Sequence, residues 1–274
     1  MQKIAAMLVV ATTLATSNLG AAEPAMKLSC QAWTFRRYTF VETLDILKKA
    51  GIHYVEAFPG QKLGGDLTGS MHFNMPVEVR AQVQAKLKDA GVKLGAFGVV
   101  GAKDEAEWRK LFEFAKAMGI ETITSEPGEK QLDYVDRLAQ EFKIKVAIHN
   151  HPKPSHYWNP DTVIAACKGR SQWIGSCSDT GHWVRSGLDP IECLKKLEDR
   201  VLHLHFKDLN VRDAKAYDVP WGAGASDAAG QLRELKRQGF HGIVSAEYEH
   251  DTPELASNVR KCAEFFRAQT GAGN

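Results

Sequence analysis

The stretch "VAIHNHP" (residues 146–152) decides the fold, because an apolar run typical of a buried strand stops at His149, Asn150 and His151. Each of these polar groups needs a partner if it is buried. The cluster is therefore either the mouth of a site or a satisfied structural end of a strand. Other strand ends along the chain distinguish these two interpretations.

Short apolar runs alternate with longer amphipathic runs along the chain. In residues 104–119, Trp108, Leu111 and Phe112 fall on one helical face and Gly119 ends the helix. The strand candidates are residues 27–35, 54–58, 93–100, 122–127, 145–151, 174–179, 201–208 and 242–249. Eight such units predict a single (β/α)8 TIM barrel. A doubly wound open sheet is the alternative, but no glycine-rich phosphate loop follows the first strand.

Composition and charge narrow the class of protein. The chain has 274 residues, of which 44% are hydrophobic and 25% charged, and its net charge is +2. This composition is typical of globular proteins, and the charge does not indicate nucleic-acid or anionic-membrane partners. No CxxC pair occurs among the five cysteines, so a zinc–thiolate site is not indicated. Their disulfide pairing stays open.

The first residues are typical of a secretory signal. Lys3 precedes the apolar segment "IAAMLVVATTLA", and small residues follow in "NLGAAEPA". We expect residues 1–22 to be a signal peptide, residues 23–274 to form the barrel domain, and the protein to be periplasmic or secreted. An uncleaved N-terminal anchor is the alternative.

Carboxylates and imidazoles follow several of the predicted strands. These are Glu56, Glu126, His149, His151, Asp179, His182, His203, His205, Lys207, Asp208, Glu247 and Glu249. The carboxyl ends of barrel strands meet at one face, and the crowded like charges there favour a divalent cation. Oxygen and imidazole ligands together suit Mn2+, with Zn2+, Co2+ and Mg2+ as alternatives.

For several of these residues, a purely structural role stays open as an alternative to a role in the metal site. Asp179 can cap the following turn, and Glu56 or Lys207 can form salt bridges. Because His203 alternates with His205, we expect one of the two to face the outer helix layer, and favour His203. Glu249 can point outward beside Glu247 for the same reason.

Three ordered motifs resemble the xylose-isomerase-like barrels of sugar isomerases and epimerases: "SDTGH" (178–182), "HLHFKD" (203–208) and "GFHGIVSAEYE" (239–249). The resemblance covers about residues 27–268. It implies that Asp179, His205 and Glu247 are metal ligands. The family also has a glutamate at the end of the fifth strand, where this chain has His149. Glu126 in "TSEP" is our candidate for the missing carboxylate.

The resulting site is a hypothesis about named residues. The metal ligands are Glu126, His149, Asp179, His205 and Glu247. The catalytic candidates are Glu126, Glu247, His151 and Lys207. The substrate-binding candidates are Glu56, Asn150, His182, Trp158, Gly222 and Gly224, the last two because "WGAGASD" resembles a family turn in which the backbone approaches the ligand.

The resemblance implies a metal-dependent isomerase or epimerase that removes a proton next to a carbonyl through an enediolate. A lyase, hydratase or dehydratase acting on a keto-sugar or 3-keto-glycoside is the second interpretation, which export favours because phosphorylated sugars are rare outside the cytoplasm. A non-catalytic sugar-binding barrel is the third, and an apurinic-site endonuclease the least favoured. We expect a small carbohydrate as partner, no nucleic acid, no membrane after signal cleavage, and leave a homodimer open.

Overall fold

Eight parallel strands close into a barrel in the order β1-β12-β9-β8-β7-β6-β5-β2. The structure is a computed structural model that describes residues 26–271. The barrel strands are β1 (Lys27–Gln31), β2 (Tyr54–Ala57), β5 (Lys93–Phe97), β6 (Thr122–Ser125), β7 (Lys145–His149), β8 (Ile174–Asp179), β9 (Val201–Phe206) and β12 (Ile243–Ala246). The predicted single (β/α)8 TIM barrel is confirmed.

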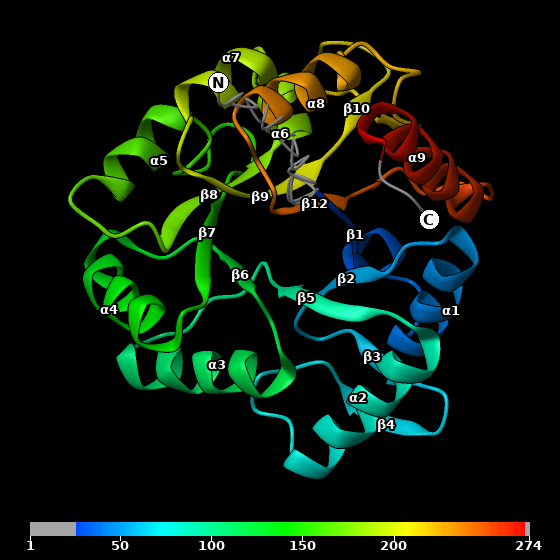
Figure 1. The fold of residues 1–274 in the computed structure, drawn as a ribbon, viewed down its shortest axis with the longest axis vertical. Coiled ribbons are helices and arrows are strands. Elements are labelled where there is room, and N and C mark those ends of the chain that lie inside the picture. Colours follow the sequence, from blue (N-terminus) through cyan, green and yellow to red (C-terminus); the bar gives the residue numbers. More distant parts are fainter. Residues whose placement is uncertain (1–25, 272–274) are drawn as a thin grey trace, which may run out of the picture.

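Helices surround the strands on the outside of the barrel (Figure 1). They are α1 (Phe40–Ala50), α2 (Val77–Ala90), α3 (Glu105–Met118), α4 (Leu132–Phe142), α5 (Pro160–Cys167), α6 (Thr180–Arg185), α7 (Pro190–Lys196), α8 (Ala228–Arg237) and α9 (Leu255–Thr270). The last helix, α9, packs beside the first, α1, so the two ends of the barrel sequence meet.

Helix α3 shows why these segments fold as they do. Asp104 caps its first turn by accepting a hydrogen bond from the backbone N–H of Glu107 at 3.0 Å. The stripe that contains Trp108 and Leu111 is fully buried, and Gly119 ends the helix at a φ of 74°. The face predicted from the sequence is therefore the face that packs on the barrel.

The first strand ends earlier than its apolar run. β1 stops at Gln31, and the chain turns into the 3-10 helix η1 (Ala32–Phe35). The side chain of Gln31 accepts a hydrogen bond from the backbone N–H of Trp33 at 3.1 Å, which stabilises this turn. As a result, Trp33 projects from the carboxyl-end face of the barrel and does not continue the strand.

Two antiparallel hairpins extend this face. The pair β3 (Lys62–Gly64) and β4 (Leu67–Ser70) lies between β2 and α2, in the glycine-rich segment 58–74. The pair β10 (Asp208–Leu209) and β11 (Asp218–Val219) lies between β9 and α8. Both hairpins follow barrel strands, so they build up the rim around the strand ends.

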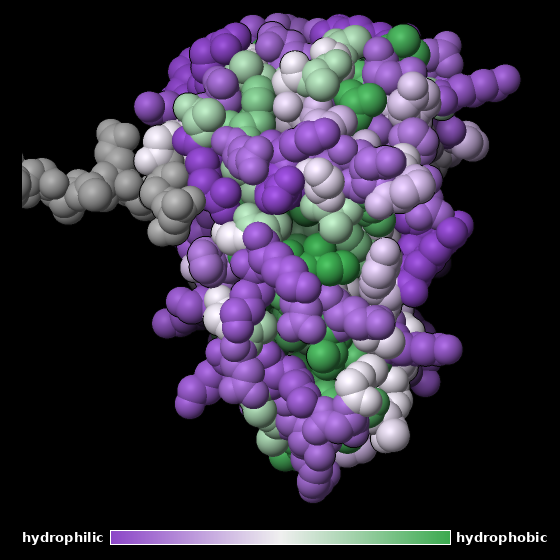
Figure 2. Space-filling model, turned by 90° about the vertical axis from the view of Figure 1, so that its right-hand side faces the viewer, coloured by the Kyte–Doolittle hydropathy of each residue, from purple (hydrophilic) through white to green (hydrophobic). Residues whose placement is uncertain are grey.

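Hydrophilic residues cover most of the face drawn in Figure 2, and apolar residues show mainly between them. Within residues 26–271, no helix has both the length and the apolar character needed to cross a membrane. All five cysteines are buried free thiols. The predicted signal peptide, residues 1–22, lies outside the described residues, so the expected cleavage stays a prediction.

Candidate metal centre and active site

A cavity of about 550 Å³ opens at the carboxyl ends of the strands. The residues that line one side of it, which we call the polar wall, are Glu126, His149, His151, His182, Glu247 and Glu249. Those of the facing side, the apolar wall, are Gln31, Trp33, Phe58, Pro59 and residues 98–101. Because β1, β2 and β5 are neighbours in the barrel, the apolar wall occupies one arc and the polar wall the other.

A second cavity, of about 340 Å³, opens at the amino ends of the strands beside Trp173 and Phe240. Its lining residues belong to none of the groups of potential metal ligands found among the described residues. The potential metal ligands therefore lie at the carboxyl ends of the strands, as expected for a TIM barrel.

Four buried side chains come together at the base of the first cavity. His149, Asp179, His205 and Glu247 each offer a ligand atom, and these atoms all lie within 4.8 Å of one another. They come from the ends of β7, β8 and β9 and from the residue after β12. The structure thus brings together four of the five predicted ligands.

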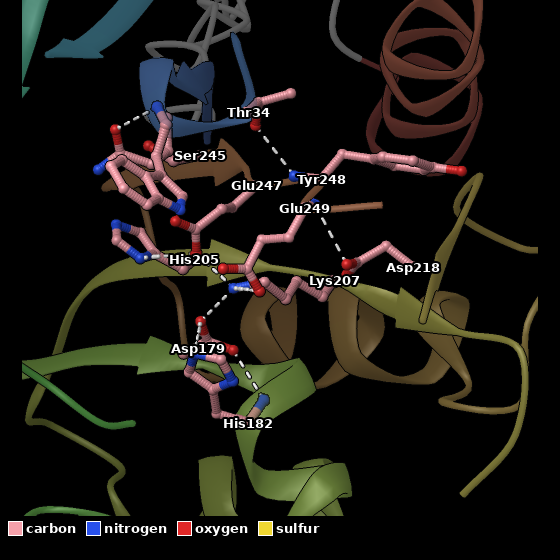
Figure 3. A network of polar contacts seen from close by, with 12 residues as sticks. Thr34, Asp179, His182, His205, Lys207, Asp218, Ser245, Glu247, Tyr248 and Glu249 are labelled. Carbon is pink, nitrogen blue, oxygen red and sulfur yellow. Dashed lines mark hydrogen bonds and ion pairs between the residues drawn. The ribbon is translucent and has the colours of Figure 1, made fainter. Parts of the chain in front are cut away.

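Lys207 lies among the same carboxylates. Its fully buried ammonium contacts Oδ2 of Asp179 and Oε2 of Glu247, and lies 3.6 Å from Oε2 of Glu249. Figure 3 shows the lysine between Asp179 and the two glutamates. Lys207 is therefore a buried part of the site and not a solvated charge at a strand end.

Asp179 is held in place by its neighbours along the chain. It caps α6 by accepting a hydrogen bond from the backbone N–H of His182 at 2.8 Å. Its own backbone N–H and C=O are paired with the side-chain amide of Asn150 at 2.8 and 3.0 Å. Asn150, a predicted substrate contact, therefore serves to join the ends of β7 and β8.

The fifth predicted ligand, Glu126, lies beside the cluster. Its Oε1 accepts a hydrogen bond from Nδ1 of His149 at 3.0 Å and also contacts Nδ1 of His151. Glu126 is about one quarter exposed, at 26% of its side chain, whereas His151 is 51% exposed at the cavity. Glu126, His149 and His151 form a second, more open group of potential ligands.

Glu56 lies beneath the site and not on its lining. It is fully buried, and its carboxylate accepts hydrogen bonds from Nε2 of His203 at 2.6 Å, Nε2 of His205 at 3.0 Å, Ser245 at 2.9 Å and Thr124 at 2.6 Å. Its predicted role as a substrate contact is not supported, because these partners separate it from the cavity.

The expectation that His203 faces the outer helix layer is wrong. His203 and His205 are two residues apart and contact the same carboxylate inside the barrel. Side chains two apart on a strand point to the same face, so both imidazoles lie inside the barrel. Glu249 follows β12, as Glu247 does, and also lies on the cavity lining.

Three further predicted substrate contacts face other partners. The backbone N–H groups of Gly222 and Gly224 donate to Oδ2 of Asp208 at 2.9 and 3.0 Å. A Cβ on Gly224 would lie 2.3 Å from Oδ1 of that aspartate, so the glycine is required for this turn. Trp158 packs against the ammonium of Lys153 at 4.0 Å. None of the three belongs to the cavity lining.

His182, by contrast, lies on the polar wall as predicted. Its Nε2 is 3.4 Å from Oδ2 of Asp179, and its Nδ1 is 3.3 Å from Arg185. Arg185 also contacts Glu249 and Asp218, each at 3.2 Å. Sequence reasoning missed Arg185, although its place three residues after His182 on one helix was a usable signal.

Sequence reasoning also missed most of the apolar wall. The side-chain amide of Gln31 donates to the carbonyl of Gly98 at 3.0 Å, which joins the ends of β1 and β5. A Cβ on Gly98 would lie 2.1 Å from the carbonyl oxygen of Thr124. Trp33 packs edge-on against Phe58, with ring centroids 5.1 Å apart. These residues carry no ionisable group, so the search for polar strand ends passed over them.

The charged groups of the site stabilise one another in their ionised forms. Burial alone would raise the pKa of Glu247, but Lys207 and His205 lower it to about 2. Burial would likewise raise the pKa of Asp179, yet His182 and Lys207 hold it well below its usual value. Burial opposes the charge of Lys207, but the surrounding carboxylates raise its pKa well above the usual value. All three groups are therefore ionised at neutral pH.

The four clustered side chains fit a divalent cation. The buried Nδ1 of His205 lies 3.1 Å from Oε2 of Glu247, while its Nε2 donates to Glu56. This Nδ1 makes no hydrogen bond within the described part of the chain. A ring nitrogen this close to a carboxylate needs a proton or a metal cation between the two, and a divalent cation at the centre of the group would supply that positive charge. Two imidazoles and two carboxylates suit manganese, cobalt or zinc.

The chain is similar to known proteins over much of its length. A solved protein of unknown role from Parabacteroides distasonis is 36% identical, with a TM-score of 0.73, and the match covers 89% of this chain and 98% of that one. An inosose dehydratase from Bacillus thuringiensis is 25% identical over 72% of each chain. Matches to the curated relatives span from 42% to 84% of their lengths.

The fold has a further relative in an IolI protein with a bound zinc atom, which is 17% identical, has a TM-score of 0.66, and matches over 90% of this chain and 98% of that one. The family described as the xylose isomerase-like TIM barrel matches residues 44–269. The match spans all the strands and helices between α1 and α9, including every candidate ligand. The chain therefore belongs to the xylose isomerase-like TIM barrel family.

Proposed function

We propose that this protein is a metal-dependent carbon–oxygen lyase that eliminates water or an alcohol from a keto-sugar or a related keto-ring. The observation that carries the proposal is the buried group of His149, Asp179, His205 and Glu247 beside a cavity of about 550 Å³. Relatives named inosose dehydratase support elimination over isomerisation, which ranked first on sequence alone.

The identity of the residue at 149 also favours elimination. In the ketose epimerases that the sequence resembles, two metal-bound glutamates exchange a proton with opposite faces of the substrate. Here one of those places holds His149, whose nitrogens face Glu126 and Asp179. The symmetric pair of bases is therefore missing, whereas an elimination needs only one base and one acid.

A divalent ion, when bound, supplies Lewis-acid polarisation of the substrate carbonyl, which acidifies the neighbouring C–H bond. His149, Asp179, His205 and Glu247 would hold this ion. We propose Mn2+, with Zn2+ as the main alternative because a relative of the same fold holds zinc. The donor set suits both ions.

Side chains of the protein itself would transfer the proton. His151 lies on the cavity lining, and its hydrogen bond with Glu126 raises its pKa above the usual value. An imidazole can both accept a proton and return it. His151 would remove the proton from the carbon next to the carbonyl, while the ammonium of Lys207 stabilises the negative charge that develops.

The balance of the reaction is simple. The C–H bond and the neighbouring C–O bond break, and a C=C bond forms. The departing oxygen takes from His151 the proton that the imidazole removed, and leaves as water or as an alcohol. The apolar wall would bind the less polar face of the ring, with Trp33 and Phe58 stacked beside it.

The test is incubation of the manganese-loaded protein with keto-inositols, free keto-sugars and 3-keto-glycosides in heavy water, followed by mass spectrometry. We expect loss of water or of the aglycone. Deuterium uptake without such a loss would instead establish an isomerase or epimerase. Binding of metal and sugar without any exchange would establish a binding protein and contradict the proposal.

We also propose that the protein is exported, because residues 1–22 have the pattern of a secretory signal. Cell fractionation followed by N-terminal sequencing tests this. A mature chain that begins near Glu23 in the periplasm or the medium is the expected result, and an uncleaved cytoplasmic chain would contradict it.

A further inference from the structure

The two histidines of the metal group present opposite ring nitrogens to it. In His149, Nδ1 lies 3.0 Å from Oε1 of Glu126, and Nε2 lies 3.5 Å from Oδ2 of Asp179. In His205, Nε2 lies 3.0 Å from Oε1 of Glu56, and Nδ1 lies 3.1 Å from Oε2 of Glu247. Each ring thus stands between two carboxylates, one at the centre of the group and one behind it.

A cation at the centre of the group would determine where the proton of each ring sits. The nitrogen that faces the cation must offer a lone pair, so the ring's single proton would lie on the nitrogen that faces Glu126 or Glu56, and that carboxylate would accept a hydrogen bond from it. Metal-binding histidines in proteins commonly donate their second N–H to such a carboxylate, which fixes the tautomer and the ring orientation.

We propose that Glu126 and Glu56 are positioning residues and not ligands, and that they make His149 bind the metal through Nε2 and His205 through Nδ1. The inference rests on the metal centre of the proposed function. It reassigns Glu126, which the sequence placed among the ligands. The negative charge that this chain lacks at position 149 is supplied by Glu126 from behind the imidazole.

The two carboxylates differ in how firmly they are fixed. Glu56 is fully buried and accepts hydrogen bonds from four side chains. Glu126 is 26% exposed and is held by His149 and His151. Substitution of Glu56 would disturb the barrel interior, so the informative variants are those of Glu126.

A second ion bound by Glu126, His149 and His151 is the main alternative, since their ligand atoms also lie within 4.8 Å of one another. That ion would need Nδ1 of His149, the atom that faces Glu126. If Nε2 bound the first ion, the ring would then have to lose both of its protons. Stoichiometry distinguishes the two arrangements.

The experiment is titration of the metal-free full chain with Co2+, followed by visible absorption, in the wild type, Glu126→Gln and Glu126→Ala. Glu129→Gln is the matched control, because Glu129 lies three residues further along the chain and faces another histidine, His156, at 3.7 Å. We expect one ion per chain in all four proteins. The Glu126 variants should bind it about 10- to 100-fold more weakly, with an unchanged shape of the cobalt spectrum, because the ligands are retained.

Other results would overturn the inference. A changed cobalt spectrum in Glu126→Gln would make Glu126 a ligand, and two ions in the wild type but one in the variant would establish the second site. An affinity equal to that of Glu129→Gln would show that Glu126 has no positioning role.

Nitrogen-15 NMR of the zinc-loaded protein detects the tautomer directly, and we expect it to show that Nδ1 of His149 is protonated. A wild type that binds no ion overturns the proposed function itself and this inference with it.

Discussion

The polar wall and the apolar wall of the cavity are built by different physical means. Every ionisable group of the polar wall has a partner of opposite charge or a hydrogen bond that fixes it, as Glu247 has in the ammonium of Lys207 (Figure 3). The apolar wall depends on the course of the backbone. Gly98 lies against Thr124, and its carbonyl accepts a hydrogen bond from the side-chain amide of Gln31. The comparison indicates that chemistry is concentrated on one arc of the barrel and ring recognition on the other.

If this division holds, removal of a single carboxylate from the metal group at the base of the cavity has the largest effect. We expect Asp179→Asn to lose bound metal and to reduce activity on the order of 10³-fold or more, since a metal contributes several kcal/mol to the transition state. Metal content by mass spectrometry and turnover measure this. Asp189→Asn is the control, because Asp189 caps α7 as Asp179 caps α6 but belongs to none of the groups of potential metal ligands among the described residues. Full metal content in Asp179→Asn would show that the site is misassigned.

Lys207→Met tests whether the buried carboxylates Asp179 and Glu247 are held together by the charge of the lysine. Without the ammonium, Asp179 and Glu247 face each other uncompensated, so we expect the metal-free protein to lose about 3–5 kcal/mol of unfolding free energy. Added Mn2+ should then stabilise the variant more than the wild type. Denaturant unfolding with and without chelator measures both effects. Lys195→Met, which removes an exposed ion pair with Glu192, should change the free energy of unfolding far less, because solvent screens that pair. Equal losses of unfolding free energy in the two variants would contradict the claim that Lys207 compensates the charges of Asp179 and Glu247.

The apolar wall should respond to mutation in a different kinetic parameter. Trp33 is 43% exposed on the lining and packs against Phe58, so we expect Trp33→Ala to raise KM about tenfold and to leave kcat nearly unchanged. Steady-state kinetics on the substrate found in the panel measures this. Tyr38→Ala is the control, because Tyr38 is as exposed but lies off the lining. A drop in kcat with an unchanged KM would show that Trp33 takes part in the chemical step. It would contradict the assignment of ring binding to the apolar wall and of the chemical step to the polar wall.

The same division explains what the sequence could predict. The barrel follows from eight alternating units, and the clustering of His149, Asp179, His205 and Glu247 follows from their positions at strand ends, because parallel strands end on one face. The apolar wall could not be found in this way, since a glycine or a glutamine at a strand end carries no chemical signal. Gly98 matters only because Thr124 of the neighbouring strand lies against it.

The roles of individual polar residues were also beyond the sequence. Glu56 and Glu126 both follow the rule for strand-end carboxylates, yet one lies beneath the site and the other beside it. The difference depends on which neighbouring side chains reach them, and that is set by the packing of β9 and β12 around Glu56. Spacing along one strand does not contain this information.

The smallest predicted effect concerns the pair at the edge of the polar wall. The hydrogen bond with Glu126 raises the pKa of His151 above 6.5. Burial would raise the pKa of Glu126, but hydrogen bonds with His149 and His151 lower it to about 2. In metal-free protein, we expect Glu126→Gln to lower the pKa of His151 towards its ordinary value, as measured by NMR titration of the imidazole protons.

The sign of the accompanying stability change is fixed by both shifts. The raised pKa of His151 stabilises the fold fully below about 6.5 and ceases to do so as the pH rises through the folded-state value, while the lowered pKa of Glu126 stabilises it above about 4.5. The wild type should therefore exceed Glu126→Gln most between about pH 4.5 and 6.5, and by less at about pH 9. Urea unfolding at these pH values measures the difference. A difference that grows towards alkaline pH would mean that the two side chains are not paired in solution, and His151 would then lose the partner that makes it the proposed base.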